Sequence, residues 1–168
     1  MHSYSLINGG GEKLSTIIEG VEIKKLNVHK DERGFFCEII HNSESFFQNS
    51  FAQLSCSMAF TGVAKAWHLH KKQTDWMCAL IGDMKLALYD TRKTSKTYKK
   101  IMEILMGETH GLKVVKIPPG IAHGYKVING PMYIVYVTNR EYDPTDELRI
   151  LHDDPEIGYD WKAAPPIK

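Results

Sequence analysis

Short apolar segments rich in β-branched and aromatic residues recur along the whole chain, and helical patterns are scarce. Clusters of Gly, Pro, Asn and Asp, such as DERG, IGD, PPG and NGP, separate these segments. This pattern is typical of an all-β barrel or sandwich, so we expect an all-β fold with few short helices. The segments are STIIEGVEIKKLNV, GFFCEII, SFAQLSCSMAF, WMCALIG, MKLALYDT, LKVVKIP, YKVING and MYIVYVTN.

Three segments carry more specific expectations. SESFFQNSF can hold one short helix, whereas IMEILMG fits a helix or a strand that completes a hairpin with the segment before it. In MKLALYD, apolar and mixed side chains alternate, so one face of that strand is expected to be wet or to line a cavity.

The length and charge of the chain limit its organisation and its partners. A chain of 168 residues is most simply a single domain, residues 1–168, with a core at about residues 20–161 and termini that are flexible or ordered by a partner subunit. Its 21 basic and 20 acidic residues create no strong field, so neither nucleic acid nor a membrane is the expected partner. The expected partner is a small molecule.

Targeting signals and cysteines point to a reducing compartment. No apolar run approaches the roughly 18 residues of a bilayer span, and the start lacks a hydrophobic signal core, so a cytoplasmic location is expected. Cys37, Cys56 and Cys78 are odd in number and form no CxxC pair. We therefore expect free, buried thiols and no disulfide.

The stretch GVAKAWHLHKKQTDWMCALIG, residues 62–82, concentrates polar side chains between apolar flanks. Alternate side chains of a strand share a face, so WHLH would project His68 and His70 into the same space. Asp75 follows across a short polar bend. A metal site, a proton-transfer site and a solvated strand edge are all compatible with this stretch.

The spacing of the glycines, histidines and acid in residues 62–82 resembles the first motif of the cupin superfamily, with Asp75 where that motif has glutamate. Residues 111–129 match the second cupin motif more loosely, with His123 in register and one extra residue before the proline. The resemblance implies a double-stranded β-helix barrel, also called a jelly roll, in which these side chains can converge.

Convergence would create a candidate metal site. His68, His70, Asp75 and His123 would then form a set suited to a divalent ion of iron, manganese, nickel or zinc, because imidazole and carboxylate are borderline-to-hard ligands. The competing interpretation has one catalytic histidine, the other merely hydrogen-bonded, and no metal.

A closer resemblance covers about residues 20–161. The segments DERGFFCE, GVAKAWH, YDTRKTSKTY, IPPGIAHGY, YVTNREYDP and DDPEIGYDW occur in this order. Together they are similar to the dTDP-4-dehydrorhamnose 3,5-epimerase family, a cupin group of nucleotide-sugar epimerases. The resemblance implies an isomerase in deoxysugar or polysaccharide biosynthesis, a nucleotide-linked keto-sugar as ligand, a homodimer with exchanged N-terminal strands, and no cofactor.

The resemblance also implies catalytic roles. The family's general base falls on His68 and its general acid on Tyr136. Epimerisation beside a C4 ketone needs a base to remove a proton, stabilisation of the enolate, and an acid on the opposite face. A histidine that titrates near neutral pH suits the first task, and tyrosine can deliver the second proton.

The same resemblance implies a substrate-binding set. In the family, the DERGFF segment contacts nucleotide and phosphate across the dimer interface, which points to Arg33, Phe35 and Glu38. His123 is expected near the keto group of the sugar. The rest of the expected set is Gln53, Lys65 and Lys72.

Several residues depart from the family pattern. Lys65 and Ala66 replace the arginine and glycine before the base, His70 replaces a glutamine, and Asp75 replaces the catalytic lysine. The family's aspartate partner of the base has no equivalent before the end of this chain. Two alternatives therefore stay open: a metal-dependent sugar isomerase or oxygenase, and a non-catalytic binder of nucleotide sugars.

Overall fold

Strands make up almost all the regular structure in the computed structural model, which describes residues 6–7, 11–14, 16–48 and 50–163. Within these residues the only helix is the 3₁₀ turn η1 (Trp161–Ala163), and no helix could span a membrane. The strands are β1 (Leu6–Ile7), β2 (Gly11–Leu14), β3 (Glu22–Leu26), β4 (His29–Asp31), β5 (Gly34–Phe36), β6 (Gln53–Ala59), β7 (Ala64–His70), β8 (Asp75–Asp90), β9 (Ile101–Gly107), β10 (Lys113–Ile117), β11 (Ile121–Thr138) and β12 (Glu147–Arg149).

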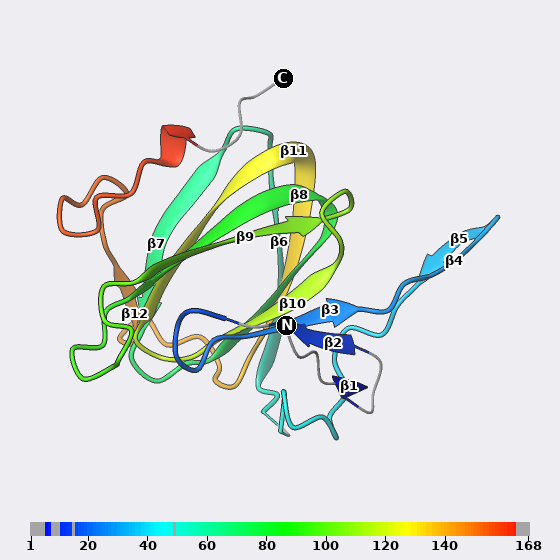
Figure 1. Cartoon of the computed structure of the whole chain (residues 1–168), viewed down its shortest axis with the longest axis horizontal. Coiled ribbons are helices and arrows are strands. Elements are labelled where there is room, and N and C mark those ends of the chain that lie inside the picture. The colour runs from blue at the N-terminus through cyan, green and yellow to red at the C-terminus, as the bar shows by residue number, and fades with distance from the viewer. Residues whose placement is uncertain (1–5, 8–10, 15, 49, 164–168) are drawn as a thin grey trace, which may run out of the picture.

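The two longest strands, β8 and β11, pair along their whole length and belong to both faces of the molecule (Figure 1). Residues 123–126 of β11 pair with β7 on one side, whereas residues 132–138 pair with β6. Residues 75–77 of β8 pair with β10, and residues 83–89 pair with β9. Among the described residues these strands belong to one 10-stranded sheet, and each long strand passes from one half of it to the other. The two halves, which face each other in the jelly-roll arrangement expected from the cupin resemblance, are called the two sheets below.

The core lies between the two sheets and is extended by a second apolar layer outside β8. Met84, Leu86 and Leu88 are fully buried in the central cluster. On the other side of the strand, Ala87 and Tyr89 pack with Trp67, Trp161 and their neighbours. The expectation of a wet face on this strand is therefore wrong, because the C-terminal segment covers it.

Two further local expectations are wrong. Residues 43–48 form turns and residues 50–51 have no regular structure, so no helix forms there. Phe46 and Phe47 are both buried against Trp76, whose Nε1 donates to the Phe46 carbonyl at 3.0 Å. Of the free cysteines only Cys78 is buried, since Cys56 points outward from β6.

One local expectation is confirmed, and the expectation for the termini is only partly covered by the described residues. IMEILMG is strand β9, paired with β8 as a hairpin partner. Of the termini expected to be flexible or partner-ordered, residues 1–5, 8–10 and 164–168 lie outside the described residues, and residues 6–7 and 11–14 form β1 and β2.

Gly82 sits in β8 where the strand changes sheets, and its backbone has φ +72°. A Cβ there would lie 2.5 Å from the Asn129 carbonyl oxygen, so we expect Gly82→Ala to lower the free energy of unfolding by about 3 kcal/mol or more. Gly111→Ala is the matched control, because Gly111 has a similar φ of +82° and its nearest contact is 3.7 Å away. Urea denaturation of both variants checks this; equal losses would mean that the backbone angle alone matters.

Candidate functional site

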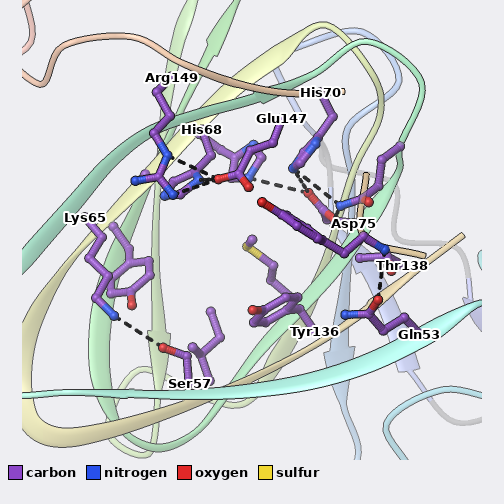
Figure 2. A pocket seen from close by; sticks show the side chains of 17 residues that line it. Gln53, Ser57, Lys65, His68, His70, Asp75, Tyr136, Thr138, Glu147 and Arg149 are labelled. Atoms are coloured by element: carbon purple, nitrogen blue, oxygen red, sulfur yellow. Dashed lines mark hydrogen bonds and ion pairs between the residues drawn. The ribbon is translucent and has the colours of Figure 1, made fainter. Parts of the chain in front are cut away.

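A cavity of about 420 Å³ opens between the two sheets, at one end of the barrel. Alternate side chains of β6, β7, β8, β11 and β12 point into it, as the strand period requires (Figure 2). His68 and His70 enter from β7, Asp75 from the start of β8, and His123 from β11. Both histidines and Asp75 of the 62–82 stretch thus line a cavity, so the solvated-edge interpretation holds only for the bend at Lys71 and Lys72, which are exposed.

His68 is paired with an acid that sequence reasoning missed. Its Nδ1 lies 3.1 Å from Oε1 of Glu147, which β12 brings alongside β7. Burial opposes ionisation of Glu147, yet the hydrogen bond from Arg149 and the positive charges of Arg149 and His68 lower its pKa overall. An ionised Glu147 accepts the Nδ1 proton of His68 and leaves the Nε2 lone pair free to act as a base.

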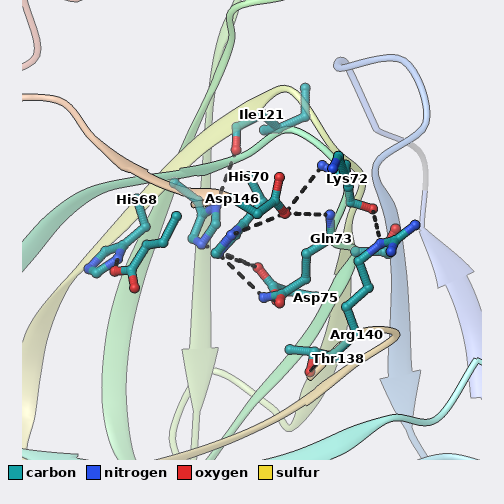
Figure 3. A network of polar contacts seen from close by, with 12 residues as sticks. His68, His70, Lys72, Gln73, Asp75, Ile121, Thr138, Arg140 and Asp146 are labelled. Atoms are coloured by element: carbon teal, nitrogen blue, oxygen red, sulfur yellow. Dashed lines mark hydrogen bonds and ion pairs between the residues drawn. The ribbon is translucent and has the colours of Figure 1, made fainter. Parts of the chain in front are cut away.

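Three of the four potential metal ligands converge more deeply in the cavity. Ligand atoms of His70, Asp75 and His123 all lie within 4.8 Å of one another. Figure 3 shows His70 and Asp75 of this group. Burial raises the pKa of Asp75 and lowers the pKa values of both histidines, that of His123 to about 4. His68 lies beside this group, with its ring centroid 6.1 Å from that of His123.

Tyr136 lines the same cavity from the opposite sheet. It belongs to the second half of β11 and pairs with Ser55 of β6, whereas His68 belongs to β7 and pairs with His123. In Figure 2 the two side chains come from different walls of the cavity. Burial raises the pKa of Tyr136, so its hydroxyl keeps its proton at neutral pH.

The expected substrate-binding residues divide into two groups. Gln53, Lys65 and His123 line the cavity. Lys72 is exposed outside it and contributes its backbone N–H to Asp146 at 3.3 Å.

Arg33 and Phe35 lie on the β4–β5 hairpin, with Glu38 just after it, and this exposed arm projects away from the barrel of its own subunit (Figure 1). Arg33 is bonded there to Asp31. None of the three residues on this segment lines the cavity.

Further cavity residues escaped the sequence reasoning. Arg149 and Tyr142 line the mouth region with Glu147, and Gln73 donates to Asp75 Oδ1 at 2.7 Å. The alternation of ELR would place Glu147 and Arg149 on one face, which is the only local signal for them. That signal does not say which face is the inner one.

Known proteins share the sequence pattern and the fold of this chain. The family model for dTDP-4-dehydrorhamnose 3,5-epimerase matches residues 15–167. The spore coat polysaccharide biosynthesis protein SpsL of Bacillus subtilis (strain 168) is 41% identical over 149 residues, covering 88% of this chain and 98% of SpsL. A dTDP-4-dehydrorhamnose 3,5-epimerase of Methanothermobacter thermautotrophicus is 30% identical over 155 residues, covering 88% of this chain and 82% of that protein.

Solved structures include a similar fold with a bound ligand. The dTDP-6-deoxy-D-glucose-3,5-epimerase of Legionella pneumophila, in complex with dTDP-4-keto-L-rhamnose, superposes with a TM-score of 0.79 and 25% identity. The superposition covers 89% of this chain and 82% of that chain.

Proposed function

The chain belongs to the dTDP-4-dehydrorhamnose 3,5-epimerase family, and from this premise we propose that it epimerises carbons next to the C4 ketone of a dTDP-4-keto-6-deoxyhexose. Family membership makes it a carbohydrate epimerase, which is an isomerase. The names of its relatives, one in spore coat polysaccharide biosynthesis and one in low-salt glycan biosynthesis, support a role in supplying a deoxysugar to a polysaccharide.

One observation carries the proposal: His68 and Tyr136 face one cavity from opposite sheets. In the proposed reaction, His68 Nε2 removes the proton from C3 or C5, and the electron pair of that C–H bond moves into an enolate. Tyr136 then donates a proton to the same carbon from the other side of the ring, which inverts its configuration. The two proton transfers require a base and an acid and no organic cofactor.

Glu147 acts in this proposal as the positioning residue for His68. The 3.1 Å contact gives His68 a carboxylate partner from β12. A buried or half-buried carboxylate that accepts the Nδ1 proton holds the ring orientation and stabilises the imidazolium that forms on proton abstraction.

The nucleotide end of the substrate is assigned to the cavity mouth and to a second subunit. Lys65 and Arg149 line the cavity and can neutralise phosphate charge. We propose that the β4–β5 arm reaches the cavity of a second copy and contributes Arg33, Phe35 and Glu38 there.

An exposed apolar face supports the homodimer. Leu54 and Met58 of β6, at 62% and 40% exposure, point outward beside Tyr133 and Ile81, at 39% and 49%. Three of these side chains are neighbours in the sheet, because Tyr133 pairs with both Met58 and Ile81, and Leu54 lies further along β6. A contiguous apolar patch of this kind marks an interface between proteins, and a second copy would cover it.

Isotope exchange tests the proposed function. The purified protein is incubated with dTDP-4-keto-6-deoxyglucose in deuterated water, and NMR follows the protons at C3 and C5. Loss of one or both signals, with appearance of the inverted sugar, is the expected result and names the reaction. Tight binding of the substrate with neither exchange nor inversion would make the protein a nucleotide-sugar binder and overturn the proposal.

The arm is tested by mixed dimers. Arg33→Ala and His68→Ala subunits are co-expressed with different tags, and the heterodimer that carries both tags is isolated. If the arm serves the partner's cavity, one of its two sites is intact, so about half of the wild-type activity returns. A heterodimer as inactive as its two parent homodimers would show that the arm serves its own subunit, and failure to isolate any dimer would contradict the interface.

A further inference from the structure

The deepest part of the cavity has the geometry of a metal site. Asp75 Oδ2 lies 3.7 Å from Nε2 of His70 and 3.5 Å from Nε2 of His123 (Figure 3). The side chains of Asp75 and His123 are almost fully buried, and that of His70 is 14% exposed. Three ligand atoms therefore point at one small volume, which opens only toward the substrate cavity.

Hydrogen bonding determines which atoms present lone pairs there. His123 Nδ1 lies 3.1 Å from the Ile121 carbonyl oxygen, which can only accept, so the ring proton is on Nδ1 and the Nε2 lone pair faces Asp75. The gap of 3.5 Å to Oδ2 is longer than a hydrogen bond of about 2.7–3.2 Å. An imidazole lone pair and a carboxylate oxygen at this distance repel each other unless Asp75 is protonated, as its raised pKa favours, or a cation lies between them.

His70 is arranged in the same way. The Gln73 amide nitrogen lies 3.4 Å from His70 Nε2 and donates to Asp75 Oδ1 at 2.7 Å, so Nε2 again presents a lone pair. The other ring nitrogen faces Asp146, with Nδ1 3.9 Å from Oδ2.

Asp146 is held rigidly in that position. Its carboxylate accepts the backbone N–H groups of Lys71, Lys72 and Gln73 at 3.1–3.3 Å. The Ile121 carbonyl behind His123 is the kind of outer contact that orients a metal ligand, whereas Asp146 faces His70 from beyond hydrogen-bond distance.

The charges around the cavity also favour a bound cation beside Asp75. Across the described residues, Asp75 has no lysine or arginine within ion-pair distance, only the two histidines. The two cations that line the cavity are engaged elsewhere, Lys65 with Ser57 and Arg149 with Glu147. Among the described residues, no free lysine or arginine therefore stands beside Asp75 to give a developing enolate the positive charge it needs.

We propose that His70, Asp75 and His123 bind one divalent first-row transition-metal ion at the closed end of the cavity. Two imidazoles and one carboxylate with an open side suit zinc, iron, manganese, cobalt or nickel. The catalytic half of this inference rests on the proposed function: the ion supplies, next to the base His68, the positive charge that stabilises the enolate.

Metal binding is tested without any activity assay. Chelator-stripped wild-type protein is titrated with Co²⁺ and with Zn²⁺, and one ion per chain is the expected stoichiometry. The Co²⁺ spectrum should show nitrogen and oxygen ligands without a thiolate charge-transfer band. Absence of stoichiometric binding, or a thiolate band from the free cysteines, would overturn the site.

Two isosteric variants locate the ion. Asp75→Asn and His70→Gln are expected to weaken binding at least about a hundredfold. His152→Gln is the matched control, because the His152 side chain is 70% exposed, and it should bind like the wild type. Circular dichroism and thermal unfolding confirm that each variant is folded. Unchanged affinity in the folded Asp75 and His70 variants would also overturn the site.

Exchange measurements separate this inference from the proposed function. If exchange at C3 or C5 falls on stripping and returns with one equivalent of metal, both are supported. Equal exchange in stripped and loaded protein would overturn the role of the ion and leave the epimerase intact. Stoichiometric metal with no exchange in either form would overturn the proposed function and leave the metal site standing.

Discussion

Substitution of His68 by alanine is expected to lower proton exchange at C3 and C5 about a thousandfold, because the variant keeps the cavity and loses the base. His68 supplies the nitrogen that faces the substrate space, and Glu147 already occupies its other ring nitrogen. Deuterium incorporation by NMR under single-turnover conditions measures the change. The His152→Ala variant is the control, because that side chain is exposed outside the cavity.

Glu147→Gln tests whether His68 needs the Glu147 carboxylate in order to act as the base. The amide can present an N–H to His68 Nδ1, which would favour the tautomer with the proton on Nε2 and so block the base. We expect exchange to fall about ten- to a hundredfold, less than for loss of the base itself. Wild-type exchange in His68→Ala would contradict the assignment of the base, and wild-type exchange in Glu147→Gln alone would reduce Glu147 to a structural contact.

Tyr136→Phe is expected to separate proton removal from inversion. The variant keeps the ring, which packs against the central apolar cluster, and loses only the hydroxyl. His68 can still remove a proton, exchange it with solvent and return deuterium from the same side. Formation of the inverted sugar should fall about a hundredfold or more, while deuterium incorporation continues.

The measurement compares two signals in one NMR experiment, the loss of the C3 or C5 proton and the appearance of the inverted product. Tyr98→Phe is the matched control, because Tyr98 lies outside the cavity and outside the exposed apolar face. Inversion at the wild-type rate in Tyr136→Phe would assign the acid to another group. Loss of both signals would place Tyr136 in proton removal or substrate binding instead.

The local sequence pattern predicted much of the fold. The local predictions that failed did so because contacts with distant parts of the chain decide those segments. Turn residues and strand alternation predicted an all-β barrel, because both act within a few residues of the chain. The expected helix in residues 43–51 failed because Phe46 and Phe47 are drawn against Trp76, which lies about thirty residues away. The expected wet face of β8 failed because the C-terminal segment covers it.

The sequence by itself determined that His68 and His70 share a face, since the period of a strand requires it, and family resemblance then singled out His68 and Tyr136. Only the tertiary structure decided that Glu147 reaches His68, because 79 residues separate them and β12 brings them together. It also decided that His70, Asp75 and His123 converge while His68 stands aside. The spacing of residues along a strand determines on which face their side chains lie, whereas the convergence of side chains from different strands depends on how distant strands pair across the sheet.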